Sequence, residues 1–261
     1  MKFAHVNGQR REARPNLSGE CRSCGEPMVA KCGEVRVWHW AHKGRSPLCD
    51  RWWENETEWH RAWKDQFPVD WQESVHPAED GQRHIADVKT PDGWVIEFQH
   101  SHIAPEERRS RDVFYRKLVW VVDATRRKTD AAQFRKALEA SAPVGGGPVR
   151  RVRPDRCRLL QEWADSPAPI FFDFGSGPTL WWLVAGRHDE PMYVAPWSRI
   201  EFIATLLGKG SEGARDFDEF ARNVNEIVAP YNARPQSQSL QPSPIHANGL
   251  RPRSVRRRFR F

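Results

Sequence analysis

The alternation of apolar and polar residues between Gly81 and Ile103 predicts two short β-strands joined by a tight turn. The segment Pro91–Gly93 suits the three loop positions of a hairpin, because proline favours the first position and glycine takes the left-handed third. With this loop, Asp87 lies opposite Glu97 on the neighbouring strand. Successive side chains of a strand alternate between its faces, so Gln99 shares the face of these two acids.

Two carboxylates that face each other across a strand pair lie roughly 5 Å apart. Asp87 and Glu97 have no basic neighbour on either strand face of the predicted hairpin, so their charges repel each other unless a cation lies between them. The pair therefore indicates a Mg²⁺ or Mn²⁺ site for phosphodiester hydrolysis. The alternative is an edge hairpin whose acids are solvated.

Three tryptophans at helical spacing predict an amphipathic helix over residues 52–66, with the tryptophans in the core. Glu56, His60 and Lys64 recur every four residues and line a second face of this helix. These three residues belong to a functional site or to a solvated face that is stabilised by ion pairs between successive turns.

Further elements follow along the chain. Up to Asp123, the pattern predicts a strand over Val69–Val75 that contains Glu73, a helix from Pro105 that carries Arg108, Arg109, Arg111, Tyr115 and Arg116, and a buried strand over Leu118–Val122. Beyond Asp123, it predicts helices over 130–140, 198–207 and 214–229 and a second hairpin over 170–184 that extends the sheet. The arginines of the Pro105 helix either contact phosphates or are solvated.

The composition suits a polyanionic partner, since the 261 residues carry a formal net charge of +7 and the pI is near 9.4. Residues 230–250 are rich in Pro, Ser, Gln and Asn, which predicts a flexible linker. The tail from Arg251 to Phe261 holds six arginines and is either a sequence-independent nucleic-acid contact or a solvated tail. No segment has the apolar length of a signal peptide or a membrane span, so we expect a soluble, cytoplasmic protein with no membrane partner.

The central hairpin resembles a known family. The segments Gln82–Val88 and Val95–Ser101 are similar to the nuclease domain of the competence protein CoiA family, a branch of the PD-(D/E)XK nucleases. The similarity covers roughly residues 20–123, nearly half of the chain. Its further anchor residues are Glu56, Glu58, His60, Lys64, Arg108, Arg111, Tyr115 and Trp120.

The resemblance implies that Asp87 and Glu97 hold a catalytic Mg²⁺ or Mn²⁺ ion and that Gln99 orients the attacking water. Many related nucleases have lysine at the position of Gln99, but the CoiA pattern itself has glutamine there. Gln99 can hold a water or a phosphate oxygen, but it cannot supply the positive charge of a lysine. Lys64 is the residue that can supply this charge.

The resemblance also assigns roles to residues outside the hairpin. The first helix of PD-(D/E)XK folds often turns an acid toward the metal, which is a role for Glu56 or Glu58, with His60 and Lys64 near the phosphate. The implied partner is DNA, single- or double-stranded. The predicted nucleic-acid contacts are Arg83, Arg108, Arg111 and Tyr115.

Five cysteines, an odd number, argue against a disulfide framework and favour free thiols or a metal site. The run from Cys21 to Cys24, followed by Gly25, has the spacing of half a zinc site, and the second half is expected from residues 39–42 and Cys49. The CoiA pattern contains the same second half. The predicted ligands of this structural zinc site are Cys21, Cys24, His42 and Cys49, with His39 as the substitute for Cys49 and Cys32 as a weaker candidate. Buried reduced thiols and a core histidine are the alternative.

Together, these patterns predict an α/β fold: a PD-(D/E)XK restriction-endonuclease-like core, in which helices flank a mixed sheet, with an N-terminal zinc-ribbon-like lobe. The predicted divisions are 1–50 for the lobe, 51–125 for the core, 126–229 for an α/β extension, and 230–261 for the linker and basic tail. The predicted function is a metal-dependent deoxyribonuclease in DNA uptake and recombination or in defence against foreign DNA. A catalytically inactive, zinc-containing DNA-binding or processing factor and a zinc-stabilised scaffold for a partner protein are the alternatives.

Overall fold

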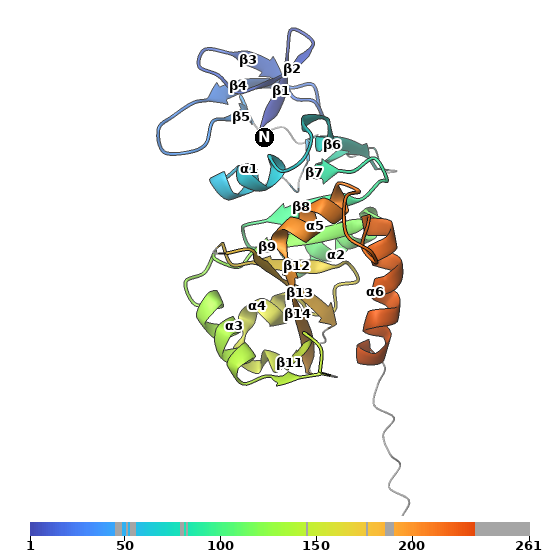
Figure 1. The fold of residues 1–261 in the computed structure, drawn as a ribbon. Helices are drawn as coiled ribbons and strands as arrows, with labels where there is room; N and C mark the ends of the chain where they lie inside the picture. The colour runs from blue at the N-terminus through green and yellow to red at the C-terminus, as the bar shows by residue number, and fades with distance from the viewer. Residues whose placement is uncertain are drawn as a thin grey trace, which may run out of the picture.

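Two β-sheets build the protein, a small one near the N-terminus and a large one that carries most of the chain (Figure 1). The computed structural model describes residues 1–44, 49–50, 52, 56–78, 81, 83–144, 146–175, 177–185 and 191–232. The predicted arginine tail and the predicted linker beyond Asn232 lie outside these residues, and so does Gln82.

The small sheet forms the N-terminal lobe, as the cysteine-rich sequence predicts. Its strand order is β2-β1-β3-β4-β5. The strands are β1 (Phe3–Val6), β2 (Gln9–Glu12), β3 (Ser18–Glu20), β4 (Pro27–Lys31) and β5 (His39–His42). Met28 and Trp40 are fully buried at its centre, so the lobe has a hydrophobic core of its own.

The large sheet is mixed and has nine strands in the order β10-β11-β14-β13-β12-β9-β8-β7-β6. The strands are β6 (Gln72–Pro77), β7 (Arg83–Lys89), β8 (Val95–Gln99), β9 (Leu118–Asp123), β10 (Ala142–Pro143), β11 (Arg150–Val152), β12 (Ile170–Asp173), β13 (Thr179–Ala185) and β14 (Met192–Ser198). Strand β9 runs parallel to both of its neighbours, β8 and β12. The other pairs are antiparallel.

Helices cover both faces of the large sheet, so the predicted α/β architecture of a mixed sheet flanked by helices is confirmed (Figure 1). One face packs against α2 (Pro105–Phe114), α3 (Asp130–Glu139) and α4 (Arg158–Trp163). The other packs against α1 (Glu58–Lys64), α5 (Arg199–Leu206) and α6 (Phe217–Asn232). Two short 3-10 helices, Val69–Trp71 and Pro154–Arg156, complete the fold. None of the helices in the described part of the chain is long and apolar enough to cross a membrane.

The sequence of β9 is apolar from Leu118 to Val122 because both faces of this strand are buried. Leu118, Trp120 and Val122 pack on the side of α2, whereas Val119 and Val121 pack on the side of α1. A strand that is covered by helices on both faces needs no polar positions, as in parallel sheets generally.

The central hairpin has the predicted loop. The backbone N–H of Thr90 donates to the carbonyl of Trp94, and Gly93 adopts a φ of 85°. The strand pairs Val88 with Ile96, so the three residues 91–93 form the loop as the turn chemistry predicts.

Two predicted boundaries are wrong. The helix predicted over 52–66 begins at Glu58, because the hydroxyl of Thr57 accepts a hydrogen bond from the N–H of His60 and caps the helix there. The strand predicted over Val69–Val75 starts at Gln72, after a 3-10 turn. Within that strand Glu73 has a φ of 47°, which breaks the predicted alternation of side chains.

The residues beyond Asp123 complete the same sheet rather than forming a separate one. The predicted second hairpin is present as β12 and β13, and β12 pairs with β9. Strand β14 and helix α4 have no counterpart in the sequence prediction. The helix predicted over 214–229 continues to Asn232, so the first residues of the predicted linker are helical.

Candidate functional site

The candidate site lies where the pairing between β7 and β8 ends. The register of β7 and β8 places Asp87 opposite Glu97, one position beyond the paired residues Val88 and Ile96. The Oδ2 atom of Asp87 accepts a hydrogen bond from the N–H of Phe98 at 3.0 Å. The carboxylate thus takes the place of a backbone carbonyl, which keeps Asp87 beside the neighbouring strand.

A third acid comes from the edge strand β6. The pairs Gln72↔Val88 and Ser74↔Ala86 place Glu73 level with Asp87. The unusual backbone conformation of Glu73 turns its side chain inward, where it is 4 % exposed and accepts hydrogen bonds from the N–H groups of Lys2 and Phe3. The lobe therefore contributes two backbone donors to this site.

Lys64 connects three of the acids. Its Nζ atom lies 2.8 Å from Oε2 of Glu56, 3.2 Å from Oε1 of Glu73 and 3.6 Å from Oδ1 of Asp87. Glu56 precedes α1, but Lys64 still meets it because both side chains point into the same buried space. The predicted proximity of Lys64 to Asp87 is thus present in the structure.

Arg111 of α2 binds the fourth acid. Its Nη1 atom lies 2.9 Å from Oε2 of Glu97, and its Nη2 atom donates to the carbonyl of Trp52 and to the carboxylate of Glu107. The sequence pattern of the hairpin shows no basic neighbour for the two acids. In the folded chain, α1 brings Lys64 to Asp87 and α2 brings Arg111 to Glu97. These positive charges compensate the repulsion between the two acids.

Burial nevertheless leaves Glu97 incompletely satisfied. Its Oε1 atom is buried and accepts no hydrogen bond in the part of the chain that the structure describes. Burial raises the pKa of Glu97 to about 8, although Arg111 acts in the opposite direction. Burial also raises the pKa of Asp87, against the effect of Lys64. The pair therefore favours either an added proton or an added cation.

Glu56 and Glu73 behave in the opposite way. Burial disfavours their ionised forms, but Lys64, the N-terminal amino group and Arg61 together outweigh it for Glu56, and the pKa of Glu56 falls to about 2. The pKa of Glu73 is also lowered, chiefly by Lys64 against burial. These two carboxylates neutralise Lys64, while Asp87 and Glu97 form the pair that is open to a further ligand.

Two neighbouring cavities reach the acids. The smaller, of about 40 Å³, is lined by Asp87, Glu97 and Lys64 among others. The larger, of about 610 Å³, is lined by Gln99 and by residues 100–102 and 35–37, and it shares Trp52, Glu56 and Arg111 with the smaller one. Asp87 and Glu97 thus line the small cavity, and the three shared residues separate it from a larger space that can admit a substrate.

His60 and Gln99, the remaining predicted catalytic residues, lie beside these cavities. The Nδ1 atom of His60 is 2.8 Å from the hydroxyl of Thr57, and its ring lines the smaller cavity. Gln99 is buried, donates from Nε2 to the carbonyl of Ser101, and lines the larger cavity. Glu58, the alternative to Glu56, is exposed and lines the larger cavity.

Of the four predicted nucleic-acid contacts, Arg108, Arg111 and Tyr115 are buried, whereas Arg83 is exposed. Arg108 is 5 % exposed and donates to the carbonyl of Ala164, because α2 turns it into the core. Tyr115 is equally buried. Arg83 donates to the carbonyl of Ser23 and joins the lobe to β7. Arg111 alone of the four lines the candidate site.

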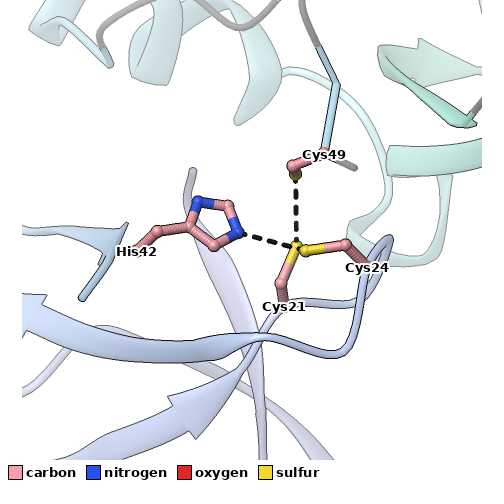
Figure 2. Close-up of side chains that lie close together, drawn as sticks. All are labelled: Cys21, Cys24, His42 and Cys49. Atoms are coloured by element: carbon pink, nitrogen blue, oxygen red, sulfur yellow. Dashed lines mark hydrogen bonds between the residues drawn. The ribbon is translucent and has the colours of Figure 1, made fainter. Parts of the chain in front are cut away.

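The predicted zinc ligands come together in the N-terminal lobe. Figure 2 shows the side chains of Cys21, Cys24, His42 and Cys49, whose ligand atoms all lie within 4.8 Å of one another. Cys24 Sγ is 3.3 Å from His42 Nε2, and Cys21 Sγ is 3.7 Å from Cys49 Sγ. The hydrogen bond between the two thiols lowers the pKa of Cys21 to about 4 and raises the pKa of Cys49, so the pair shares one proton when no metal is bound. Three sulfur atoms and one imidazole nitrogen suit a structural zinc ion, so this cluster can hold a metal such as zinc.

Local structure explains the cluster. Cys21 and Cys24 lie on the turn between β3 and β4, which Gly25 permits with a φ of 77°. His42 ends β5 and Cys49 follows it. His39 lies outside the cluster, with its Nδ1 atom 2.8 Å from the carbonyl of Val37. Cys49 occupies the position for which His39 is the predicted substitute. Cys32 does not join the cluster either.

Similarity to other proteins does not identify the chain. Comparison with protein-family models, curated proteins and solved structures finds no match. The resemblance to the CoiA family therefore rests on the motif residues alone.

Sequence reasoning missed one residue that shapes the site. Asp50 bonds through Oδ1 to Nδ1 of His84 and through Oδ2 to the N–H of Ile85. The His84 ring also stacks on Trp52, with the ring centroids 3.4 Å apart. No local motif identifies Asp50, since its partners lie more than thirty positions away in the sequence.

Proposed function

We propose that the protein is a divalent-metal-dependent nuclease that hydrolyses phosphodiester bonds of DNA with a PD-(D/E)XK-type core. The observation that carries the proposal is the Asp87–Glu97 pair on adjacent strands, with the buried Oε1 of Glu97 lacking a hydrogen-bond partner among the described residues. The pair lines the small cavity that shares Trp52, Glu56 and Arg111 with the larger one. The motif resemblance supports the same function and is the reason to name DNA as the substrate.

The donor set fits Mg²⁺ or Mn²⁺. Both ions prefer carboxylate oxygens, and Mg²⁺ commonly binds through one or two carboxylates and keeps several waters. Among the described residues, the cysteine–histidine cluster is the one group in which three or more potential ligands surround a metal position. No third such residue in the part of the chain that the structure describes joins Asp87 and Glu97, so these two acids would be the protein ligands at this site. When bound, the ion polarises the scissile phosphate and makes a bound water more acidic.

The protein's own residues hold this arrangement in place. Lys64 and Arg111 bind the acids from two sides and fix the carboxylate positions. Gln99 lies on the face of Glu97 and orients the attacking water. Lys64 and His60, together with Arg111, offset the charge that develops on the phosphate. The resemblance places such an activity in DNA uptake and recombination or in defence against foreign DNA.

Cleavage assays test the proposal directly. Purified protein is incubated with supercoiled plasmid and with single-stranded DNA in Mg²⁺, in Mn²⁺ and in EDTA, and we expect cleavage in the metal ions alone. Asp87→Asn and Glu97→Gln should each abolish it while the circular dichroism spectrum stays unchanged. Glu106→Gln removes an exposed carboxylate from α2 and is the matched control. Cleavage at the wild-type rate in both site variants would refute the assignment.

A second candidate is a DNA-binding or processing factor without hydrolytic activity. The observation that favours it is that Lys64 and Arg111 already supply positive charge to Asp87 and Glu97, so the fold is stable with no ion. This candidate predicts DNA binding that is independent of Mg²⁺, with no cleavage under any of the conditions above.

A further inference from the structure

A buried carboxylate holds a histidine beside the acid site. The Nδ1 atom of His100 lies 2.6 Å from Oδ2 of Asp123, and Asp123 is only 2 % exposed. The other oxygen of Asp123 accepts hydrogen bonds from the N–H of Thr125 at 2.8 Å and from its hydroxyl at 2.6 Å. Both carboxylate oxygens are thus engaged, and the imidazole is held in one orientation.

The sheet topology brings the two residues together. His100 directly follows β8, Asp123 ends β9, and these strands are parallel with Gln99 opposite Val122. Both residues therefore lie at the carboxyl ends of neighbouring parallel strands. In open α/β sheets, ligands bind outside the carboxyl ends of the strands.

The His100 ring has access to the space that a substrate would occupy. Its side chain is 35 % exposed and lines the 610 Å³ cavity together with Gln99 and Arg111. Its centroid lies 5.9 Å from that of His60, which lines the smaller cavity with Asp87. His100 thus lines the larger cavity, which adjoins the small cavity that holds Asp87 and Glu97.

We propose that His100 is the proton donor to the leaving oxygen in the nuclease reaction, and that Asp123 is the positioning residue that orients it. This inference rests on the proposed nuclease function. It names the group that protonates the leaving oxygen, a role that Asp87 and Glu97 do not fill. An Asp–His hydrogen bond keeps one proton on Nδ1, so the transferable proton of the imidazolium is the one on Nε2, and the neutral ring that remains has a bare Nε2.

The step balances as follows. A water oxygen forms the new bond to phosphorus while the bond from phosphorus to the leaving sugar oxygen breaks. The leaving oxygen takes the proton from Nε2 of the His100 imidazolium and departs as an alcohol. The proton lost by the attacking water passes to solvent, and the neutral imidazole regains a proton from solvent before the next turnover.

Two substrates separate this role from a purely structural one. The first is a single-stranded oligonucleotide, whose sugar alkoxide must be protonated as it leaves. The second is the p-nitrophenyl ester of thymidine 5′-phosphate, whose leaving group is stable as an anion at neutral pH. We expect His100→Ala to lower oligonucleotide cleavage by about 10²- to 10⁴-fold, the usual contribution of general acid catalysis, and to change ester cleavage by a small factor.

Two further variants complete the test. Asp123→Asn should shift the ratio of the two rates in the same direction but by less, because it removes the orientation and keeps the donor. His102→Ala is the matched control, since His102 is an exposed histidine on the same cavity, and it should leave the ratio unchanged.

The outcomes are distinguishable. Equal losses on both substrates, or no loss on either, would overturn the role of His100 while leaving the nuclease proposal in place. Wild-type protein that cleaves neither substrate with Mg²⁺ or Mn²⁺ would overturn the nuclease proposal, and the role of His100 with it.

Discussion

The ammonium of Lys64 lies 2.8 Å from a carboxylate oxygen of Glu56, and both side chains are buried from solvent. Ion pairs in such surroundings cost free energy to desolvate, but removing one partner costs more, because the other charge is left buried alone. Lys64 also forms ion pairs with Glu73 and Asp87, so its loss would leave three acids without their shared cation.

Lys64→Met should therefore lower the free energy of unfolding by about 3 kcal/mol or more, as measured by urea denaturation in EDTA. Arg109→Met removes an exposed cation from the surface pair with Glu106 and should cost less than about 1 kcal/mol. Similar losses in the two variants would show that Lys64 is solvated rather than buried among acids.

The lowered pKa of Glu56 predicts how acid affects stability. A glutamate has a pKa of about 4.3 in the unfolded chain, whereas the folded value is about 2. A depressed pKa contributes stability that is present above the unfolded value and is lost as the pH falls through the folded value. Glu56→Gln should therefore lose less stability than wild type between about pH 5 and pH 2.

Unfolding in urea at several pH values within that window measures the difference between the two proteins. Glu106→Gln, which alters an exposed carboxylate, should follow the wild-type curve. A Glu56→Gln curve that runs parallel to wild type over the whole window would contradict the stabilisation of the Glu56 anion by Lys64.

The lobe should contain one zinc ion per chain. Atomic emission of purified protein should give about one equivalent, and less than about half an equivalent would count against the site. Cys21→Ser and Cys49→Ser should each lose the metal and lower the melting temperature of the lobe. Cys32→Ser is the control, because Cys32 lies outside the ligand cluster, and it should retain zinc.

The features that the sequence predicts correctly depend on local chemistry. The hairpin loop follows from Pro91 and Gly93, whose backbone preferences need no tertiary context. Three of the four residues in the cysteine–histidine cluster lie on turns or strand ends, and Cys49 is the first cysteine after His42. The apolar run of β9 predicts a strand buried on both faces.

The features that the sequence misses depend on which elements pack together. Arg108 and Arg111 are three residues apart on one helix, yet one donates to Ala164 and the other to Glu97. That difference arises from the packing of α2 against a distant segment, which periodicity does not encode. The inward orientation of Glu73 likewise follows from a backbone conformation that the residue types of β6 do not predict.

The segment after Cys49 makes the two sheets mutually dependent. Asp50 directly follows Cys49 of the cysteine–histidine cluster and binds β7, while the carbonyl of Trp52 accepts a hydrogen bond from Arg111. Lys2 and Phe3, at the other end of the lobe, supply hydrogen bonds to Glu73. A polypeptide that begins at residue 51 would keep Trp52 but lose Asp50, Lys2 and Phe3, so a cut at the predicted boundary of the lobe would remove supports of the acid site.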